Sequence, residues 1–256
     1  MMRHIDASKY NTDKSVLSHY LRNYERYFEN FIDKEVRLLE LGVKDGGSLL
    51  LWRDYFEKGL ITGLDINQVE LNDPSGRIRI YQGKQQDTQL LDQIARETAP
   101  DGFDVIIDDC SHIGVLSRIS FWHLFDHHLK RGGIYAIEDW GTGYWDSFFD
   151  GVQYKRHSRS TDRSALFWLN RVFHRLQRTP FARSTLAARL IGTMKSVPVR
   201  GQYHSHDMGM VGFIKELVDE CGMGDITHPG LGIDGTRMSK IQEMRISLGH
   251  AFVVKA

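Results

Sequence analysis

The sequence predicts an α/β fold: a doubly wound, mostly parallel seven-stranded sheet with an antiparallel C-terminal strand and a helical lid insertion. Between residues 36 and 140, short runs of Val, Ile, Leu and Phe alternate with helix-like segments, the pattern of a parallel sheet covered by helices. Two of these runs, 103–108 and 134–138, end abruptly in acidic residues. Buried parallel strands show this pattern when they carry carboxylates to the sheet edge where ligands bind.

The predicted elements follow one another at regular intervals. Residues 1–35 begin with a polar segment and continue into a helix whose aromatic stripe we interpret as packing. An amphipathic helix at 208–222 stops at Gly222, and strands at 240–248 and 250–256 are joined by a tight turn at Gly249. Between these ends, the pattern predicts strands at 36–41, 60–66, 77–83, 103–108 and 134–139, helices from Ser48 and at 89–97, and a helix and turn over 121–133.

The composition excludes several classes of protein. Lys plus Arg and Asp plus Glu number 33 each, so the overall charge gives no reason to expect a nucleic acid partner. The two cysteines form neither a disulfide framework nor a zinc pattern, which favours a cytoplasmic protein. No apolar run is long enough for a transmembrane segment, and the N-terminus is too polar for a signal peptide.

One segment concentrates positive charge. Residues 151–200 contain eleven Lys or Arg and a single Asp, so this part is about +10 and the remainder about −10. Within it, residues 163–177 predict a basic helix with an apolar stripe. We expect the segment to form a helical lid or a subunit interface of a homo-oligomer. A membrane-surface contact or an acidic ligand is the alternative.

A glycine turn follows the first predicted strand. Glu40 ends that strand, Gly42 breaks it, and a glycine pair at 46 and 47 precedes the next helix. Glycines let a backbone approach a ligand closely, and a helix start supplies free amides. The spacing ExGxxxGG differs from the dinucleotide pattern GxGxxG. Asp65, at the end of the second strand, is in the position where a carboxylate accepts hydrogen bonds from ribose hydroxyls.

These features together predict an adenosine-type cofactor, with the polar end of the third strand, Gln85 and Asp87, nearby. NAD(P) and S-adenosylmethionine both suit such a turn. A pyrophosphate avoids adjacent carboxylates, and Glu40 and Asp45 flank the turn. A sulfonium cofactor that carries its own ammonium group is therefore favoured, although Rossmann-like folds bind both.

The acidic strand ends predict a metal site. Asp109, Glu138 and Asp139 offer hard oxygen donors of the kind that Mg²⁺ prefers. A bound metal lowers the pKa of a hydroxyl, and His112 follows closely enough to take the proton. Asp108 precedes this group. The alternative for either acidic stretch is an Asx turn or a helix cap, and for His112 a histidine satisfied by local backbone.

The other histidines give weaker signals. The remaining eleven, including the pair His127 and His128, have no spacing that indicates metal ligation. His204, His206 and Asp207 are a weak candidate for the substrate side of the pocket.

Several stretches, taken in order, resemble the metal-dependent S-adenosylmethionine O-methyltransferases that modify sugars, such as the macrolide-deoxysugar and polysaccharide methyltransferases. The similarity covers roughly residues 11 to 145. Two departures are Cys110, where the family usually has glycine, and Lys84, where it commonly has aspartate. The stretches are DKSVLSHYLRNYERYF, LLELGVKDGGSLLLWRDYF, GLDI, YQGKQQD, FDVIIDDCSH, LKRGGIYAIEDW and GYW.

The resemblance implies a class I methyltransferase fold and specific roles for site residues. The implied Mg²⁺ ligands are Asp109, Glu138 and Asp139, with His112 as general base. The implied cofactor-binding residues are Glu40, Gly42, Asp65 and Asp108, with Gln85 and Asp87 near adenine and Lys14, His19 and Tyr20 closing over the methionine end. The basic segment has no counterpart in the resemblance, so the substrate is not carried over.

We therefore expect one domain over 1–256, with a helical cap at 1–35, a cofactor- and metal-binding core at 36–140, a basic lid or interface at 141–205, and a C-terminal helix and strands at 206–256. The expected activity is Mg²⁺-dependent methyl transfer from S-adenosylmethionine to a hydroxyl of a sugar, glycoside or polysaccharide. A non-haem iron hydroxylase is the alternative, because one His and two carboxylates also form its metal site. A binding module without turnover is a third possibility.

Overall fold

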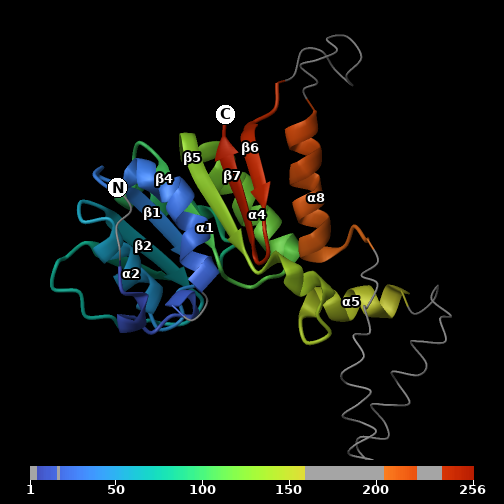
Figure 1. Ribbon diagram of the computed structural model, residues 1–256, viewed down its shortest axis with the longest axis horizontal. Helices are drawn as coiled ribbons and strands as arrows, with labels where there is room; N and C mark the ends of the chain where they lie inside the picture. The colour runs from blue at the N-terminus through green and yellow to red at the C-terminus, as the bar shows by residue number, and fades with distance from the viewer. Residues whose placement is uncertain (1–4, 16–17, 159–204, 224–237) are drawn as a thin grey trace, which may run out of the picture.

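The structure is a computed structural model that describes residues 5–15, 18–158, 205–223 and 238–256. Its centre is a seven-stranded sheet in the order β3-β2-β1-β4-β5-β7-β6 (Figure 1). The first five strands are parallel, and β7 is antiparallel to both β5 and β6. The predicted fold class, including the antiparallel C-terminal strands, is confirmed. The strands are β1 (Arg37–Leu41), β2 (Leu60–Asp65), β3 (Ile78–Gln82), β4 (Phe103–Asp108), β5 (Leu129–Glu138), β6 (Ile241–Ile246) and β7 (His250–Lys255).

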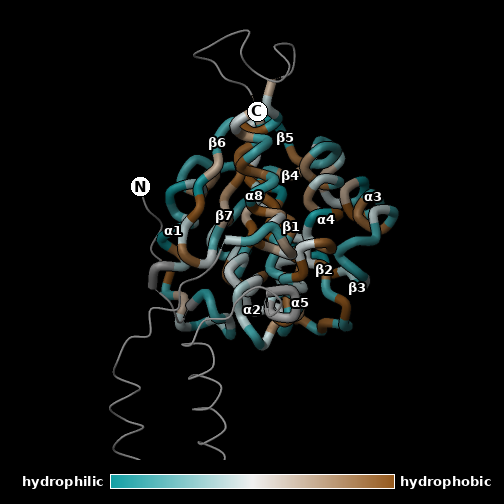
Figure 2. The backbone as a smooth tube through the Cα atoms, turned by 90° about the vertical axis from the view of Figure 1, so that its right-hand side faces the viewer, coloured by the Kyte–Doolittle hydropathy of each residue, from teal (hydrophilic) through white to brown (hydrophobic). Residues whose placement is uncertain are grey.

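Helices cover both faces of the sheet because the strand residues alternate between two apolar clusters. On β4, Ile106 packs with α3, α4 and α8, whereas Val105 and Ile107 pack with α1 and α2. The apolar stretches of the strands run between these helical layers (Figure 2). The helices are α1 (Ser18–Phe28), α2 (Gly47–Tyr55), α3 (Thr88–Thr98), α4 (Gly114–His127), α5 (Phe149–Ser158) and α8 (Gly209–Gly222).

The predicted aromatic stripe of the N-terminal helix packs against the sheet. Tyr24 and Phe28 of α1 are fully buried, and the Tyr24 ring lies 5.2 Å from that of Trp52 in α2. Three short 3-10 helices, η1 (Ala7–Lys9), η2 (Asp13–Ser15) and η3 (Glu29–Phe31), flank α1. The interpretation of the stripe as packing is confirmed. Residues 11–14, which precede α1, lie at the carboxyl edge of the parallel strands.

The predicted helix and turn over 121–133 is partly wrong. Helix α4 begins earlier, at Gly114, and β5 begins at Leu129, so residues 130–133 belong to a strand. The pairing of β4 with β5 shifts register there, and Gly132 has a φ of +71°. The sequence RGG therefore forms an irregularity inside a strand, where glycine tolerates the left-handed backbone, and not a turn before it.

The C-terminal hairpin reaches back to the end of β5. Gly249 has a φ of +82° in the turn between β6 and β7, as predicted, and its carbonyl accepts a hydrogen bond of 2.6 Å from the Asp139 amide. The 3-10 helix η4 (Trp140–Tyr144) follows Asp139. The predicted basic helix at 163–177 lies outside the described residues. Within the parts of the chain that the structure describes, each helix is too short or too polar to span a bilayer.

Candidate active site

A cavity of about 560 Å³ lies at the carboxyl edge of the parallel strands. The ends of β1, β2 and β4 meet there, because Leu41 is in register with Leu64 and Asp108. The lining comes from the segments after β1 to β4 and from residues 11–14 of the N-terminal segment. The volume lies within the range of about 300–1,000 Å³ that is usual for cofactor sites.

Gly42 brings two strand ends together at the cavity. Its φ is +83°, and a side-chain carbon added there would lie 2.2 Å from the Asp109 carbonyl oxygen. Any other residue would separate β1 from the segment after β4. Gly46, also left-handed at φ +79°, precedes the first turn of α2. The predicted glycine turn is therefore present and forms one wall of the cavity.

Asp65 supports the glycine turn from β2. Its Oδ2 accepts hydrogen bonds of 3.0 Å from the amides of Val43 and Lys44, and its Oδ1 accepts one of 2.9 Å from the Asn67 amide. The side chain also lines the cavity. The carboxylate thus fixes the shape of the wall, and its contact with a ribose stays a prediction.

Glu40 lies behind the cavity. It is fully buried, its Oε2 accepts a hydrogen bond of 2.7 Å from the Ser48 hydroxyl, and its Oε1 is 3.5 Å from Lys14 Nζ. Burial raises the pKa of Glu40 above its usual value. Ser48 and Lys14 line the cavity in front of it. Glu40 therefore acts on the cavity through these two residues in the structure as it stands.

Lys14 is the central cation of the site. Its Nζ lies 2.7 Å from Asp109 Oδ2, 3.1 Å from Glu138 Oε1 and 3.5 Å from Glu40 Oε1, and its side chain is 1% exposed. Burial by itself lowers the pKa of this ammonium, but the three carboxylates together raise it well above its ordinary value. The resemblance implies a place for Lys14 at the methionine end of a cofactor, and the structure adds its ion pairs with three carboxylates.

Asp109, His112 and Asp139 form a group of possible metal ligands. Their ligand atoms all lie within 4.8 Å of one another, and His112 Nε2 is 3.8 Å from Asp109 Oδ1. His112 and Asp139 both have a left-handed backbone, with φ of 52° and 50°. Non-glycine residues adopt this conformation at a cost of about 1–3 kcal/mol, and such strain concentrates at functional sites. Two carboxylates and one imidazole in this arrangement suit a divalent cation.

Glu138, the third predicted metal ligand, is not a member of this group. It precedes Asp139 in the chain, accepts a short hydrogen bond from the Tyr24 hydroxyl and pairs with Lys14. Burial raises the pKa of Glu138 well above its usual value, and the neighbouring Asp109 adds to this. Asp139 accepts a 2.6 Å hydrogen bond from the Tyr20 hydroxyl. Metal ligation by Glu138 stays a prediction.

The cavity wall that follows β3 contains Gln85. Its Oε1 accepts a hydrogen bond of 3.1 Å from the Ser111 amide, and its Nε2 lies 3.4 Å from Asp108 Oδ1. Asp108 itself is buried beneath, and burial raises its pKa to about 6. Lys84 and Cys110, the two departures from the family pattern, line the cavity. The buried pair of Gln85 and Asp108 therefore supports the wall from below.

Three other predicted site residues, Asp87, His206 and Asp207, make contacts away from the cavity lining. Asp87 caps α3 by accepting a hydrogen bond of 3.2 Å from the Leu90 amide, and it is not part of the cavity lining, so an adenine contact for it stays a prediction. The His206 ring stacks on Tyr154 at 3.9 Å, and Asp207 pairs with Lys215 at 2.9 Å. The side chain of His19 and all of His204 lie outside the described residues.

Two hydroxyl groups of the aromatic stripe have partners that the sequence pattern does not predict. The sequence pattern predicts only packing for Tyr24, and for Tyr20 the resemblance adds a place at the methionine end of a cofactor. Each hydroxyl donates a hydrogen bond in the structure, Tyr24 to Glu138 at the end of β5 and Tyr20 to the following Asp139. Burial is the main cause that raises the pKa of both hydroxyls. Tyrosine in place of phenylalanine at two positions of a buried stripe was the available signal, because a buried hydroxyl needs a partner.

Comparison with known proteins confirms the resemblance. No protein-family model matches the sequence. The chain is 43% identical over 150 residues to mycinamicin VI 2''-O-methyltransferase from Micromonospora griseorubida and 40% identical over 150 residues to demethylmacrocin O-methyltransferase from Streptomyces fradiae. Each alignment covers 56% of this chain and 37% of the relative.

A solved structure matches almost the whole chain. The methyltransferase MycE from the mycinamycin biosynthetic pathway, in complex with Mg and SAH, shares 31% sequence identity with a TM-score of 0.65. The match covers 99% of this chain and 55% of MycE. The chain thus spans about half the length of these relatives, and its similarity is to the macrolide-deoxysugar O-methyltransferases.

Proposed function

We propose that this chain, a relative of the macrolide-deoxysugar O-methyltransferases, transfers a methyl group from S-adenosylmethionine to a hydroxyl of a sugar in a glycoside or polysaccharide. The observation that carries the proposal is the single cavity shared by the glycine turn and by two members, Asp109 and His112, of the group of possible metal ligands. A cofactor on the turn and an acceptor on the metal would meet within it.

The residues of the turn fit S-adenosylmethionine. The close approach at Gly42, the loop held by Asp65 and the buried polar residue Gln85 give a wall that can accept a nucleoside. Asp13 and Asp45 in the cavity lining, together with Asp109, suit the ammonium and sulfonium charges of this cofactor better than they suit a pyrophosphate. When bound, the cofactor supplies the methyl group.

The donor set fits Mg²⁺. Asp109 and Asp139 would hold the ion, with Glu138 as the third predicted ligand if its bond to Tyr24 is exchanged. The four carboxylates near this position are those of Asp109, Asp139, Glu138 and Glu40. Lys14 offsets one of their negative charges, and a divalent cation would offset two more. When bound, Mg²⁺ supplies a Lewis acid that lowers the pKa of an acceptor hydroxyl.

His112 is the proposed general base. Its ring lines the cavity, 6.0 Å from the ring of Phe148, and is only partly exposed. The Asp109 carboxylate, 3.8 Å from Nε2, stabilises the imidazolium that forms when the ring takes the hydroxyl proton. Positioned bases of this kind contribute on the order of 10² to 10⁴ in rate.

A non-haem iron hydroxylase is the second candidate, because Asp109, His112 and Asp139 reproduce its set of two carboxylates and one histidine. Such an enzyme would bind the ion through the imidazole and would give the glycine turn no role. A requirement for Fe²⁺, 2-oxoglutarate and oxygen would identify it.

The direct test is transfer of labelled methyl groups from S-adenosylmethionine to a panel of glycosides and polysaccharides, with and without Mg²⁺. We expect label in at least one glycoside only when Mg²⁺ is present. The division into one domain with a basic lid or interface at 141–205, the homo-oligomer and the cytoplasmic location remain parts of the proposal.

A further inference from the structure

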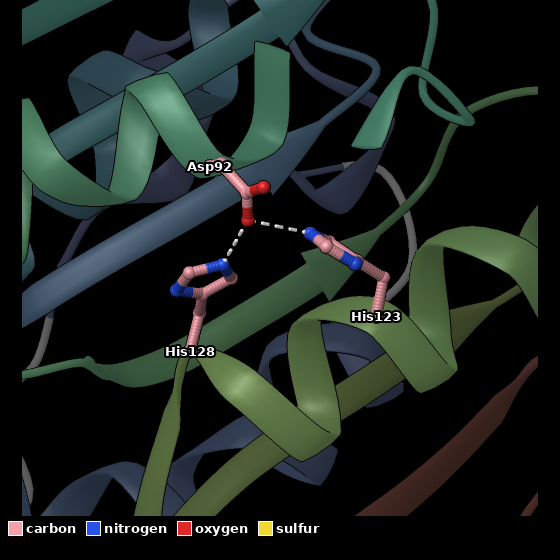
Figure 3. A group of neighbouring side chains, drawn as sticks. All are labelled: Asp92, His123 and His128. Carbon is pink, nitrogen blue, oxygen red and sulfur yellow. Dashed lines mark hydrogen bonds and ion pairs between the residues drawn. The ribbon is translucent and has the colours of Figure 1, made fainter. Parts of the chain in front are cut away.

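A second cluster of possible metal ligands lies in the helical layer formed by α3 and α4. Asp92 comes from α3, His123 from the last turns of α4, and His128 from the residue after α4 (Figure 3). Helices α3 and α4 lie side by side on one face of the sheet (Figure 2). The cavity lies at the opposite end of α4, whose first residue, Gly114, is about 14 Å along the helix axis from His123 at the usual rise per residue.

The three side chains converge on one point. Asp92 Oδ1 lies 2.8 Å from His123 Nε2 and 2.7 Å from His128 Nε2, and all three ligand atoms are within 4.8 Å of one another. Figure 3 shows both imidazoles turned toward the same carboxylate oxygen. The side chains are 38%, 18% and 19% exposed for Asp92, His123 and His128. The cluster is therefore fixed by packing on one side and open to solvent on the other.

The end of α4 produces this geometry. The helix ends at His127, and the backbone of His128 leaves the helical conformation, so its ring turns to the same side as that of His123. The His128 carbonyl accepts a hydrogen bond of 2.7 Å from the Phe103 amide at the start of β4, which holds this backbone in place. His127, between them in sequence, is exposed and is not a member of the cluster.

We propose that Asp92, His123 and His128 bind a divalent metal ion of the Zn²⁺ class through one carboxylate oxygen and two Nε2 atoms. The fourth position faces solvent and would hold water. Ligands about 2.0–2.2 Å from a tetrahedral Zn²⁺ are about 3.3 Å apart, so small side-chain rotations open the observed 2.7 and 2.8 Å contacts enough to admit the ion.

The chemistry of the donors separates this site from the carboxylate site. Imidazole nitrogen suits Zn²⁺, Co²⁺, Ni²⁺ and Cu²⁺, whereas Mg²⁺ prefers oxygen ligands. Each imidazole now presents Nε2 to Asp92. A neutral ring that binds metal through Nε2 keeps its proton on Nδ1, and a protonated ring releases one proton to solvent.

The test begins with Asp109→Asn/Asp139→Asn protein, which lacks two carboxylates of the first group. Titration with Co²⁺ should give one bound equivalent with visible absorption, and Zn²⁺ should displace it. His123→Gln and His128→Gln should each weaken binding about 100-fold or more, while His127→Gln, the matched control at the same helix end, should leave it unchanged. Glutamine can still donate a hydrogen bond to Asp92, so the helices stay joined.

X-ray absorption of the zinc-loaded Asp109→Asn/Asp139→Asn protein tests the proposal without a change in the cluster. The expected spectrum has two imidazole ligands. Oxygen-only ligation, an affinity no better than about 1 mM, or equal loss of binding in His127→Gln and His123→Gln would overturn the proposal.

Discussion

The ammonium nitrogen of Lys14 lies 2.7 Å from Oδ2 of Asp109 and connects the N-terminal segment to the carboxyl end of β4. The lysine is 1% exposed and also lies near Glu138 and Glu40. One cation thus compensates several buried acids at the centre of the proposed active site. Burial raises the pKa of Asp109 above its ordinary value, and the neighbouring Lys14 opposes that rise.

Replacement of Lys14 by Met should destabilise the metal-free protein by about 3–5 kcal/mol, because it removes the cation that three buried or partly buried carboxylates share. Urea unfolding in the presence of chelator measures this. Lys215→Met is the matched control, since Lys215 pairs with the 87% exposed Asp207. Surface pairs of that kind contribute about 0–1 kcal/mol. Equal losses in the two variants would contradict the role given to Lys14.

Asp108 should make stability depend on pH. Burial raises its pKa from an ordinary value of 3.8 to about 6, so between these two values the folded state binds more protons than the unfolded state. The free energy of unfolding should therefore fall as the pH rises from 4 to 6, by up to about 3 kcal/mol from this group. Asp108→Asn should gain stability relative to the parent over the same interval. If the difference in the free energy of unfolding between Asp108→Asn and the parent protein stays constant from pH 4 to 7, the prediction is refuted.

Asp65→Ala should largely abolish thermal stabilisation by S-adenosylhomocysteine, because Asp65 holds the loop amides of Val43 and Lys44. A ligand at a hundred times its dissociation constant adds about 2.7 kcal/mol to the unmutated protein. Asp73→Ala is the control, since Asp73 likewise accepts loop amides, those of Arg77 and Ile78, but outside the cavity lining. Protection by NADH and not by S-adenosylhomocysteine would show that the cofactor assignment is wrong.

The basic segment at 154–200 should not be a nucleic-acid surface. Its charge should give weak binding of RNA or DNA that falls steeply with salt. Fluorescence anisotropy at physiological salt measures this, and tight, sequence-selective binding would contradict the expectation. Preferred activity on phosphorylated or lipid-linked sugars would instead refine the expectation, because it would identify the kind of acceptor.

Much of the fold could be predicted because the periodic apolar pattern and the glycine turn are local signals. The separate contacts of two acids that are adjacent in sequence could not be predicted. Glu138 and Asp139 are neighbours in sequence, but Glu138 bonds to Tyr24 and Asp139 to Tyr20, and these contacts depend on how α1 packs. At the start of α4 the Gly114 amide donates a hydrogen bond of 2.8 Å to the distant Asp150, and the irregularity at residues 130–133 lies where the pairing of β4 with β5 shifts register.

The histidine cluster was missed for the same reason. His123 and His128 have no metal-binding spacing by themselves, so the sequence alone predicts no site there. Asp92 reaches them from a different helix, about thirty positions earlier in the chain. Residues joined by tertiary packing alone leave no local pattern from which their meeting could be inferred.

The central claim, that His112 acts as base beside a metal held by Asp109 and Asp139, is tested most directly by methyl transfer in His112→Ala protein and in chelated parent protein. The variant should lose on the order of 10² to 10⁴ in turnover while S-adenosylhomocysteine binding stays nearly intact, and chelation should remove activity until Mg²⁺ is restored. Methyl transfer at unchanged turnover in both samples would contradict the mechanism.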